Sequence, residues 1–272
     1  MRAISQPRSM PRRGRATVGL RRSAWRRVAR LWPPVLGMIL LLALWELAVY
    51  WFALPNFVLP LPQEILAAAL DDLPALWHDA QTTMFEATVG FVAGSVIGFL
   101  LAAGMIMYAA VERVILPVYV TVNSVPMIAF GPLVTIWFGI GVLSKIVLIV
   151  IVVSYAVLLN TLAGLRSCDP GAIALLRSFG ASDWRIMLTL RLPGALPSIF
   201  SGLKVAVVHA MILAVVVEML GAHSGLGWSI YRATQMMNFV DAWAAVLAAV
   251  AISLTLYGLV GWANKRAIWW PQ

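Results

Sequence analysis

Long apolar runs alternate with short polar segments along most of this chain. A helix that crosses the hydrocarbon core of a bilayer needs about 20 residues, and six runs come close to or exceed that length. They cover residues 35–52, 84–108, 114–138, 146–165, 198–220 and 242–263. The pattern predicts an all-α integral membrane protein with about six transmembrane helices.

Two of the runs carry additional patterns. In the second, Glu86, Gly90, Gly94, Gly98 and Ala102 recur every four residues. They therefore share one helix face, on which small residues allow the backbone of a neighbouring helix to approach closely. The third run is interrupted by three prolines, which remove helical hydrogen bonds and kink a helix. We expect a broken third span, and a one-sided helix in the basic-free segment 53–83, within PQEILAAALDDL.

The basic residues are concentrated at one end. Ten of the 20 Lys and Arg residues precede residue 31, and beyond it basic and acidic residues nearly balance. The excess is one tail, not a nucleic-acid surface. Residues 1–32 are predicted to be disordered, which leaves residues 33–268 as the transmembrane domain. By the positive-inside rule the tail is cytosolic, and six spans then place both termini on that side. A secretory signal is disfavoured, because the first apolar run is too long and lacks a small-residue cleavage site.

Several chemistries are missing from the sequence. There is no Gly-Lys dipeptide for a phosphate-binding loop and no GxSxG nucleophile motif. The three histidines lie in different segments, without the spacing of metal ligands. The single cysteine, Cys168, excludes an internal disulfide. We therefore predict that the chain is no enzyme and holds neither a metal nor a cofactor.

Ionisable and polar residues inside apolar runs are costly and often functional. Glu46, Glu86, Lys204 and Glu218 are of this kind. Lys204 is near a span end and can extend its ammonium to the interface. Glu218 either contacts outer water or faces a cavity. The residues expected to line a solute pathway, built from the second to fifth spans, are Asn123, Ser124, Ser154, Tyr155, Asn160 and Glu218.

One long polar stretch, residues 166–197, interrupts the second half. It holds four arginines and two pieces of helical length separated by Gly180. Gly180 permits the left-handed exit that ends a helix, and Ser182 or Asp183 can cap the next piece, 184–190. This helix–turn–helix is expected to dock on another protein, with Phe179 and Trp184 as its anchors. Insertion of the two aromatics into the lipid interface is the alternative.

The same stretch resembles the cytosolic loop of permease subunits of ABC importers. That loop is marked by Glu-Ala-Ala, three residues, Gly, nine residues, Ile, one residue and Leu-Pro. Gly180, Leu190 and Leu192-Pro193 match in type or position, whereas Ala174 stands where the glutamate is usual. The runs SVPMIAFGPLVTIWFGIGVLSK, NTLAGLRSCDP and SGLGWSI look like the branch for nitrate, sulfonate, taurine and pyrimidine precursors. The resemblance covers residues 35–268.

The resemblance implies a bacterial inner-membrane permease that acts as a homodimer. Its partners would be two copies of an ATPase subunit, which bind ATP and Mg²⁺, and an external solute-binding protein. The implied ATPase-coupling residues are Asp169, Ala174, Arg177, Phe179, Gly180, Ala181, Trp184, Leu190, Leu192 and Pro193. The solute would be a sulfonate-, taurine- or nitrate-type anion, or a pyrimidine or thiamine precursor. An ATP-independent secondary transporter or channel is the alternative function.

Overall fold

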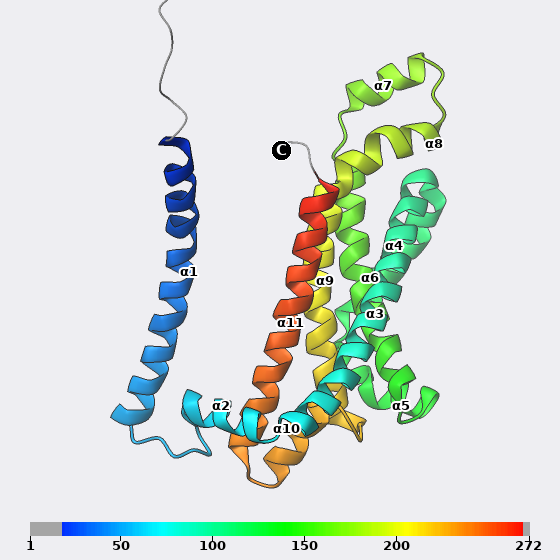
Figure 1. Cartoon of the computed structure of the whole chain (residues 1–272). Coiled ribbons are helices and arrows are strands. Elements are labelled where there is room, and N and C mark those ends of the chain that lie inside the picture. The colour runs from blue at the N-terminus through cyan, green and yellow to red at the C-terminus, as the bar shows by residue number, and fades with distance from the viewer. Residues whose placement is uncertain (1–17, 269–272) are drawn as a thin grey trace, which may run out of the picture. The chain divides into compact units, whose positions relative to one another are not determined.

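The computed structural model describes residues 18–268, which form helices and turns without a strand (Figure 1). The longer helices are α1 (Val18–Trp51), α3 (Leu73–Met107), α4 (Ala109–Ser124), α6 (Val142–Arg166), α9 (Leu192–Gly221) and α11 (Phe239–Ala267). The shorter ones are α2 (Pro62–Asp71), η1 (Met127–Phe130), α5 (Gly131–Phe138), α7 (Pro170–Ser178), α8 (Asp183–Ile186), η2 (Met187–Arg191) and α10 (Leu226–Gln235). The predicted all-α fold is confirmed.

The chain separates into two compact units, one ending at Pro55 and one beginning at Asn56. The first contains α1, and the second contains every other helix. We predicted a disordered tail over residues 1–32, of which 1–17 lie outside the described residues. From Val18 onward the chain is helical and continuous with the first apolar run, so the structure differs from the prediction over residues 18–32.

The number of spans is smaller than predicted within the described residues. Four helices are long and apolar enough to cross a bilayer: α3, α6, the continuous helix Asp183–Gly221, and α11. A fifth span arises if α4 and the Met127–Phe138 helix, bent by 87° at Val125–Pro126, count as one. The apolar part of α1, Val35–Trp51, is shorter than these. The break in the third span occurs before Pro126, because a residue preceding proline avoids helical geometry.

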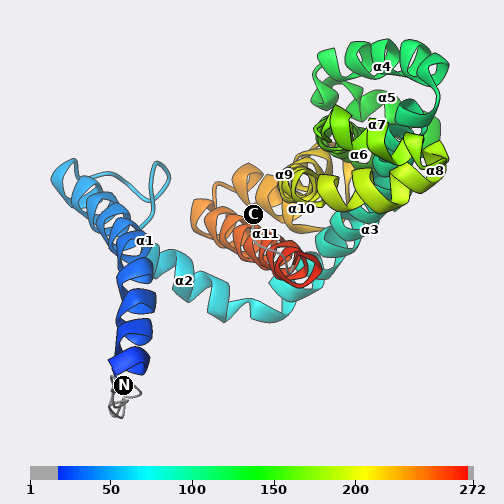
Figure 2. The same ribbon diagram turned by 90° about the horizontal axis from the view of Figure 1, so that it is seen from above.

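The second unit is a helical bundle. α3 packs against α6, α6 against α9, and α11 against α9 and α10. Figure 1 shows α7 and α8 beyond one end of this bundle and α2 and α10 at the other end. Seen from above in Figure 2, α4 and α11 lie on opposite sides of α6 and α9. The bundle therefore has two ends formed by different short helices, and α3, α6, α9 and α11 connect them.

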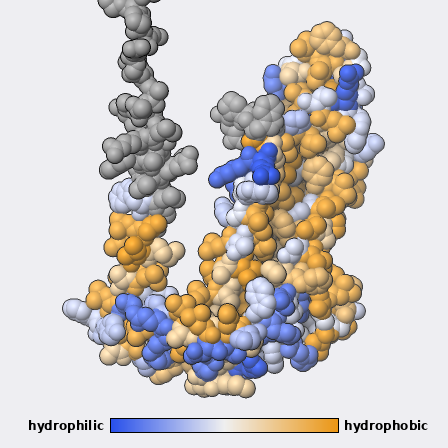
Figure 3. Space-filling view, viewed as in Figure 1, coloured by the Kyte–Doolittle hydropathy of each residue, from blue (hydrophilic) through white to orange (hydrophobic). Residues whose placement is uncertain are grey.

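The outer surface of the second unit is apolar along the helices. Leu100, Ile136, Leu254 and Trp262 are among many large apolar side chains that are more than half exposed. Figure 3 shows apolar residues along the length of the bundle and hydrophilic residues gathered near α2 and α10. A soluble protein rarely exposes so many large apolar side chains in one continuous surface. The surface is suited to lipid.

A close contact between α3 and α6 uses the predicted stripe of small residues on α3. Glu86, Gly90, Gly94, Gly98 and Ala102 are all buried. A Cβ at Gly94 would lie 2.8 Å from Cβ of Val153 and 2.9 Å from the carbonyl oxygen of Val150 on α6. The missing Cβ atoms thus allow the two backbones to touch, which is the main source of helix association in lipid.

A buried ion pair fastens the same two helices near one end. The Nζ of Lys145, in the first turns of α6, lies 2.6 Å from Oε1 of Glu86 on α3. Lys145 is 4% exposed and Glu86 is fully buried. The charge of Lys145 is therefore paired inside the bundle.

Enlarging Gly94 should loosen the α3–α6 contact. Gly94→Leu forces a side chain into the Val150–Val153 backbone, and overpacking of this kind costs about 1–3 kcal/mol. We expect a lower midpoint of thermal unfolding in detergent, followed by tryptophan fluorescence. The control is Gly258→Leu on α11, whose added Cβ would meet no atom within 4 Å. An equal loss of stability in both variants would contradict the assigned contact.

Removing one partner of the ion pair should cost more than removing both. Lys145→Met leaves the Glu86 carboxylate buried without its cation, a change that typically costs about 3–5 kcal/mol. The double variant Lys145→Met/Glu86→Gln removes both charges and should recover much of that loss. The thermal unfolding midpoints of wild type, both single variants and the double variant measure this. Additive single effects would show that the two groups are not paired.

Candidate functional site

The polar stretch 166–197 begins with a capped helix. The Asp169 carboxylate accepts hydrogen bonds from the backbone N–H groups of Gly171 (3.0 Å) and Ala172 (3.2 Å). These are among the N–H groups that a helix leaves unsatisfied at its start. Pro170 occupies the first helical position, where its missing N–H has no cost. Asp169 therefore fixes the start of α7.

The end of α7 is fixed by Gly180. Its φ is 75°, in the left-handed region that glycine adopts without strain. Its N–H donates to the Arg177 carbonyl oxygen (2.9 Å), and the Ala181 N–H donates to that of Leu176 (3.0 Å). This pair of bonds is the Schellman motif, which satisfies the final carbonyl groups of a helix. The predicted turn at Gly180 is present, with Ala181 completing it.

The second piece of the stretch differs from the prediction. Ser182 caps α8 by accepting from the Arg185 N–H (3.3 Å). From Asp183 the chain then runs as one helix of 39 residues to Gly221. Leu190, Leu192 and Pro193 are half-buried within this helix and do not form the exit of a loop. A π-helical turn at Met187–Arg191, with the Leu192 N–H donating to the Met187 carbonyl, precedes Pro193, and such turns accommodate local irregularity in a helix.

We call α7, α8 and the turn between them, residues 170–186, the knob. An ion pair across its turn joins Arg177 to Asp183 (2.9 Å) and thereby connects α7 to α8. Two aromatics face outward from it, with Phe179 78% and Trp184 60% exposed. Ala174 is also exposed on α7. The knob thus combines a fixed backbone with exposed aromatic groups at one end of the bundle (Figure 1).

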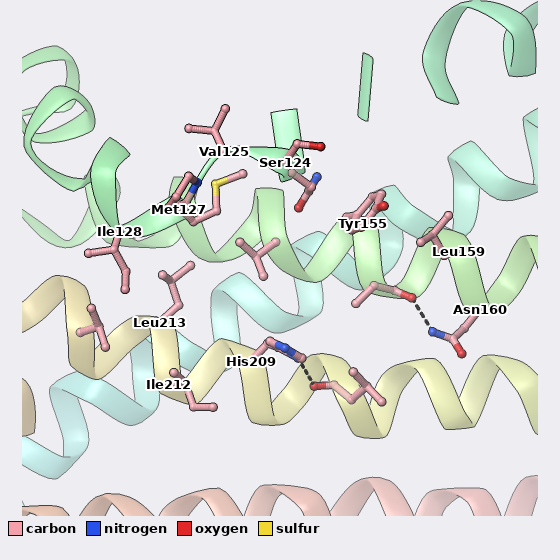
Figure 4. A pocket seen from close by; sticks show the side chains of 16 residues that line it. Ser124, Val125, Met127, Ile128, Tyr155, Leu159, Asn160, His209, Ile212 and Leu213 are labelled. Atoms are coloured by element: carbon pink, nitrogen blue, oxygen red, sulfur yellow. Dashed lines mark hydrogen bonds between the residues drawn. The ribbon is translucent and has the colours of Figure 1, made fainter. Parts of the chain in front are cut away.

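A cavity with a volume of about 610 Å³ lies between α6, α9 and the break after α4. Figure 4 shows its lining, with Tyr155 and Asn160 from α6, His209 from α9, and Ser124 and Met127 from the broken segment. Four of the residues predicted to line a pathway come together here: Asn123, Ser124, Tyr155 and Asn160. His209, one of the three histidines of the sequence, was not predicted to line the pathway. Its position inside an apolar run could have indicated that it does.

The other two predicted lining residues lie elsewhere. Ser154 is 1% exposed, and its hydroxyl donates to the Ile151 carbonyl oxygen (2.9 Å). Glu218 is fully buried at the α2–α10 end of the bundle. Its Oε1 accepts from the Thr83 hydroxyl (2.8 Å), and its Oε2 accepts from the Gly227 N–H (2.7 Å). Of the two interpretations of Glu218, outer water and a cavity, neither matches this position.

Glu218 belongs to a set of contacts that hold the start of α10. The Leu226 N–H donates to the Thr83 hydroxyl (2.8 Å), and the Gly225 N–H donates to Asp79 (3.1 Å). Carboxylates at a helix N-terminus are stabilised by its free N–H groups and its dipole. A Cβ at Gly225 would overlap the Glu218 carboxyl group, and its φ is 105°. The glycines of SGLGW are therefore needed for this close approach.

Comparison with known proteins identifies the family. The family of the binding-protein-dependent transport system inner membrane component matches residues 94–268. A probable ABC transporter permease protein of Haemophilus influenzae is 34% identical over 88% of this chain and 98% of its own length. The formylaminopyrimidine transport permease protein ThiX of Halalkalibacterium halodurans is 32% identical over 86% of this chain and 92% of its own length.

The fold is also that of a solved transporter. A chain of the inward-facing MetNI methionine ABC transporter superposes with a TM-score of 0.59. The match covers 72% of this chain and 95% of the other, at 20% sequence identity. At that identity the likeness concerns the fold, which agrees with the helical bundle described above.

The chain therefore belongs to the family of binding-protein-dependent transport system inner membrane components, and it is a membrane-spanning permease subunit of an ABC importer rather than an enzyme.

Proposed function

We propose that this permease couples ATP hydrolysis to solute import through the knob, and that the cavity is part of the solute pathway. Two copies of the permease would enclose the pathway, and two copies of the ATPase subunit would bind ATP and Mg²⁺. The external binding protein would deliver a sulfonate-, taurine- or nitrate-type anion or a pyrimidine precursor. The knob residues themselves bind no nucleotide in this scheme.

The observation that carries this proposal is the unbroken helix from Asp183 to Gly221. Trp184 is exposed at its knob end, and His209 lies on the cavity wall 25 positions further along, about 37 Å at 1.5 Å per residue. A helix transmits an axial or tilting displacement along its length. A movement of the ATPase against Trp184 would therefore displace the cavity wall at His209.

Charge supports a cytosolic position for the knob. Arg177, Arg185 and Arg191 lie in or next to it, and Lys265 and Arg266 lie in the last turn of α11. Figure 1 places that end of α11 at the same end of the bundle as the knob. Basic residues of membrane proteins accumulate on the cytosolic side. The end that holds α2 and α10 would then face the binding protein.

The open side of the cavity supports a second copy of the permease. Val205, His209 and Ile212 line the cavity on α9 and are exposed in the single chain. In a symmetric dimer, the same surface of the second copy would cover these exposed residues. A pathway between two copies would remove them from lipid.

Truncating the two knob aromatics should release the ATPase subunit. We expect Phe179→Ala/Trp184→Ala to lower the amount of co-purified ATPase at least about tenfold, because aromatic side chains commonly dominate interfaces. The permease should still insert and unfold at its usual temperature. The matched control is Trp77→Ala, since Trp77 is 57% exposed at the beginning of α3, away from the knob.

An undiminished ATPase in the double variant would contradict the coupling role of the knob. It would favour insertion of Phe179 and Trp184 into the lipid interface. Solute transport by the purified permease without any ATPase would instead favour the alternative of a secondary transporter or channel.

A further inference from the structure

A small hollow lies where the knob joins the rest of the bundle. It has a volume of about 210 Å³ and is enclosed by the last turn of α3, the first residue of α4, α7 and the first turns of the helix that continues into α9. Its charged wall consists of Arg177, Asp183 and Arg191, and Met107 and Ala109 close it on the side of the bundle. Two guanidinium groups from different helices therefore line one small space.

The charges of this wall do not cancel. The guanidinium of Arg177 is paired with the carboxylate of Asp183 (2.9 Å). Arg191 is half-buried, yet its side chain forms neither an ion pair nor a hydrogen bond with another residue of the described part of the chain. A guanidinium has five N–H donors, and partial burial of a cation without a counter-charge is costly. The hollow thus has one positive charge to offer to an anion.

The donors of Arg191 suit a phosphate group. A guanidinium binds phosphate oxygens through two parallel hydrogen bonds, and a phosphodiester carries the one negative charge that the hollow leaves uncompensated. Arg191 also ends the π-helical turn Met187–Arg191, and such turns are frequent at functional sites. A carboxylate fits the same donors, so the surroundings of the hollow decide between the two anions.

An exposed apolar face leads from the hollow along α3. Leu100 and Val96 precede Met107 by seven and eleven positions and therefore share its face of the helix. Their side chains are 61% and 53% exposed, on the face opposite to the stripe of small residues that packs on α6. The stretch from Val96 to Met107 is about 16 Å long, close to half of a hydrocarbon core of about 30 Å. One acyl chain of a single leaflet has this length.

The hollow lies at the level of lipid headgroups and apart from the proposed ATPase contact. Tyr108, between the lining residues Met107 and Ala109, is 64% exposed, and tyrosine is enriched at the boundary between membrane and water. Phe179 and Trp184 are exposed but are not among the residues that line the hollow. A lipid in the hollow and an ATPase on the two aromatics are therefore compatible.

We propose that the hollow binds the phosphate of an anionic phospholipid from the leaflet on the knob side, with Arg191 as the main ligand and one acyl chain along Leu100 and Val96. The lipid connects α3 to the helix that carries the knob and stabilises their junction. The inference is independent of the proposed ATPase contact, because neither Phe179 nor Trp184 takes part in it.

Thermal unfolding of the delipidated full-length permease in detergent tests the site. The probes are dioleoylphosphatidylglycerol, dioleoylphosphatidylcholine and inorganic phosphate. Saturating phosphatidylglycerol should raise the unfolding midpoint by about 5 °C. The other two should raise it at least about threefold less, because choline adds a cation beside the arginines and free phosphate lacks an acyl chain. Equal shifts with both lipids would overturn the selection of an anionic headgroup.

Substitution of Arg191 should remove the effect of the lipid. We expect Arg191→Gln to reduce the phosphatidylglycerol shift at least about threefold, whereas Arg191→Lys should retain part of it, since lysine keeps the charge but not the two parallel hydrogen bonds. The matched control is Arg185→Gln, because Arg185 is exposed on the same helix and does not line the hollow. This control should keep the whole shift. A wild-type shift in Arg191→Gln would overturn the inference.

A second pair of variants leaves both arginines in place. Ala109→Glu introduces a carboxylate on the opposite wall of the hollow, where it supplies the missing counter-charge and should reduce the phosphatidylglycerol shift as strongly as Arg191→Gln does. Ala109→Gln adds a neutral side chain of the same size and should keep most of the shift. Ala109 is exposed, and substitutions at exposed positions usually change stability little. Equal shifts in these two variants would contradict the proposed site.

The same measurements distinguish the sources of the anion. A shift with inorganic phosphate as large as that with phosphatidylglycerol would overturn the lipid as the ligand. Loss of co-purified ATPase in Arg191→Gln, together with a wild-type lipid shift, would assign Arg191 to a carboxylate of the ATPase and overturn the inference. Truncation of Phe179 and Trp184 tests the ATPase contact separately and should leave the lipid shift at its wild-type value.

Discussion

The contact between α3 and α6 is the constraint on which the rest of the bundle depends. Lipid tails are as apolar as leucine side chains, so burial of apolar surface gives little reason for two helices to associate in a bilayer. The close approach of α6 at Gly90, Gly94 and Gly98, with backbone contact at the last two, supplies dispersion instead. Lys145 and Glu86 add an ion pair that is favourable only in this one register. α6 is thereby placed so that its other faces meet α9 and the cavity.

The two ends of the bundle differ in how firmly their helices are attached. At one end Glu218, Thr83 and Asp79 attach α10 to α3 and α9 through its first N–H groups. At the other end α8 projects beyond the bundle as a direct extension of α9, with its aromatic side chain exposed. The arrangement anchors the helix at the α10 end and leaves the knob end accessible to a partner. Such a helix is suited to tilt about its anchored end.

The ABC importer family separates chemistry from permeation, and this chain reflects that division. Its described residues include no group of three or more His, Cys, Asp or Glu side chains that could hold a metal ion. Among the described residues, the buried charged side chains are Glu86 and Lys145, which pair with each other, and Glu218, which accepts a hydrogen bond at the start of α10. The cavity retains neutral polar groups, which a solute can approach and leave without a large desolvation cost. Weak contacts with neutral groups allow a solute to pass through the cavity rather than remain bound in it.

Local patterns in the sequence were sufficient for several features. Apolar runs of about 20 residues predicted the long helices, the four-residue stripe predicted the packed face of α3, and Gly180 predicted the turn of the knob. These features depend on periodicity and on the conformational freedom of single residues, both of which are local properties. The family resemblance was likewise carried by short motifs, although Ala174 replaced the usual glutamate.

Other features were decided by the tertiary structure alone. Lys145 pairs with Glu86 across 59 positions, and Glu218 meets Thr83 across 135, so no local pattern reveals either partner. The sequence could nominate polar residues for a cavity, but only packing separated Tyr155 and Asn160, which line it, from Ser154, which lies one helix face away against Gly98. The continuity of α8 with α9 also escaped prediction, because the π-helical turn before Pro193 absorbs a break that proline usually causes. Sequence determined which helices form; long-range packing decided which of their polar groups face the cavity and which are enclosed.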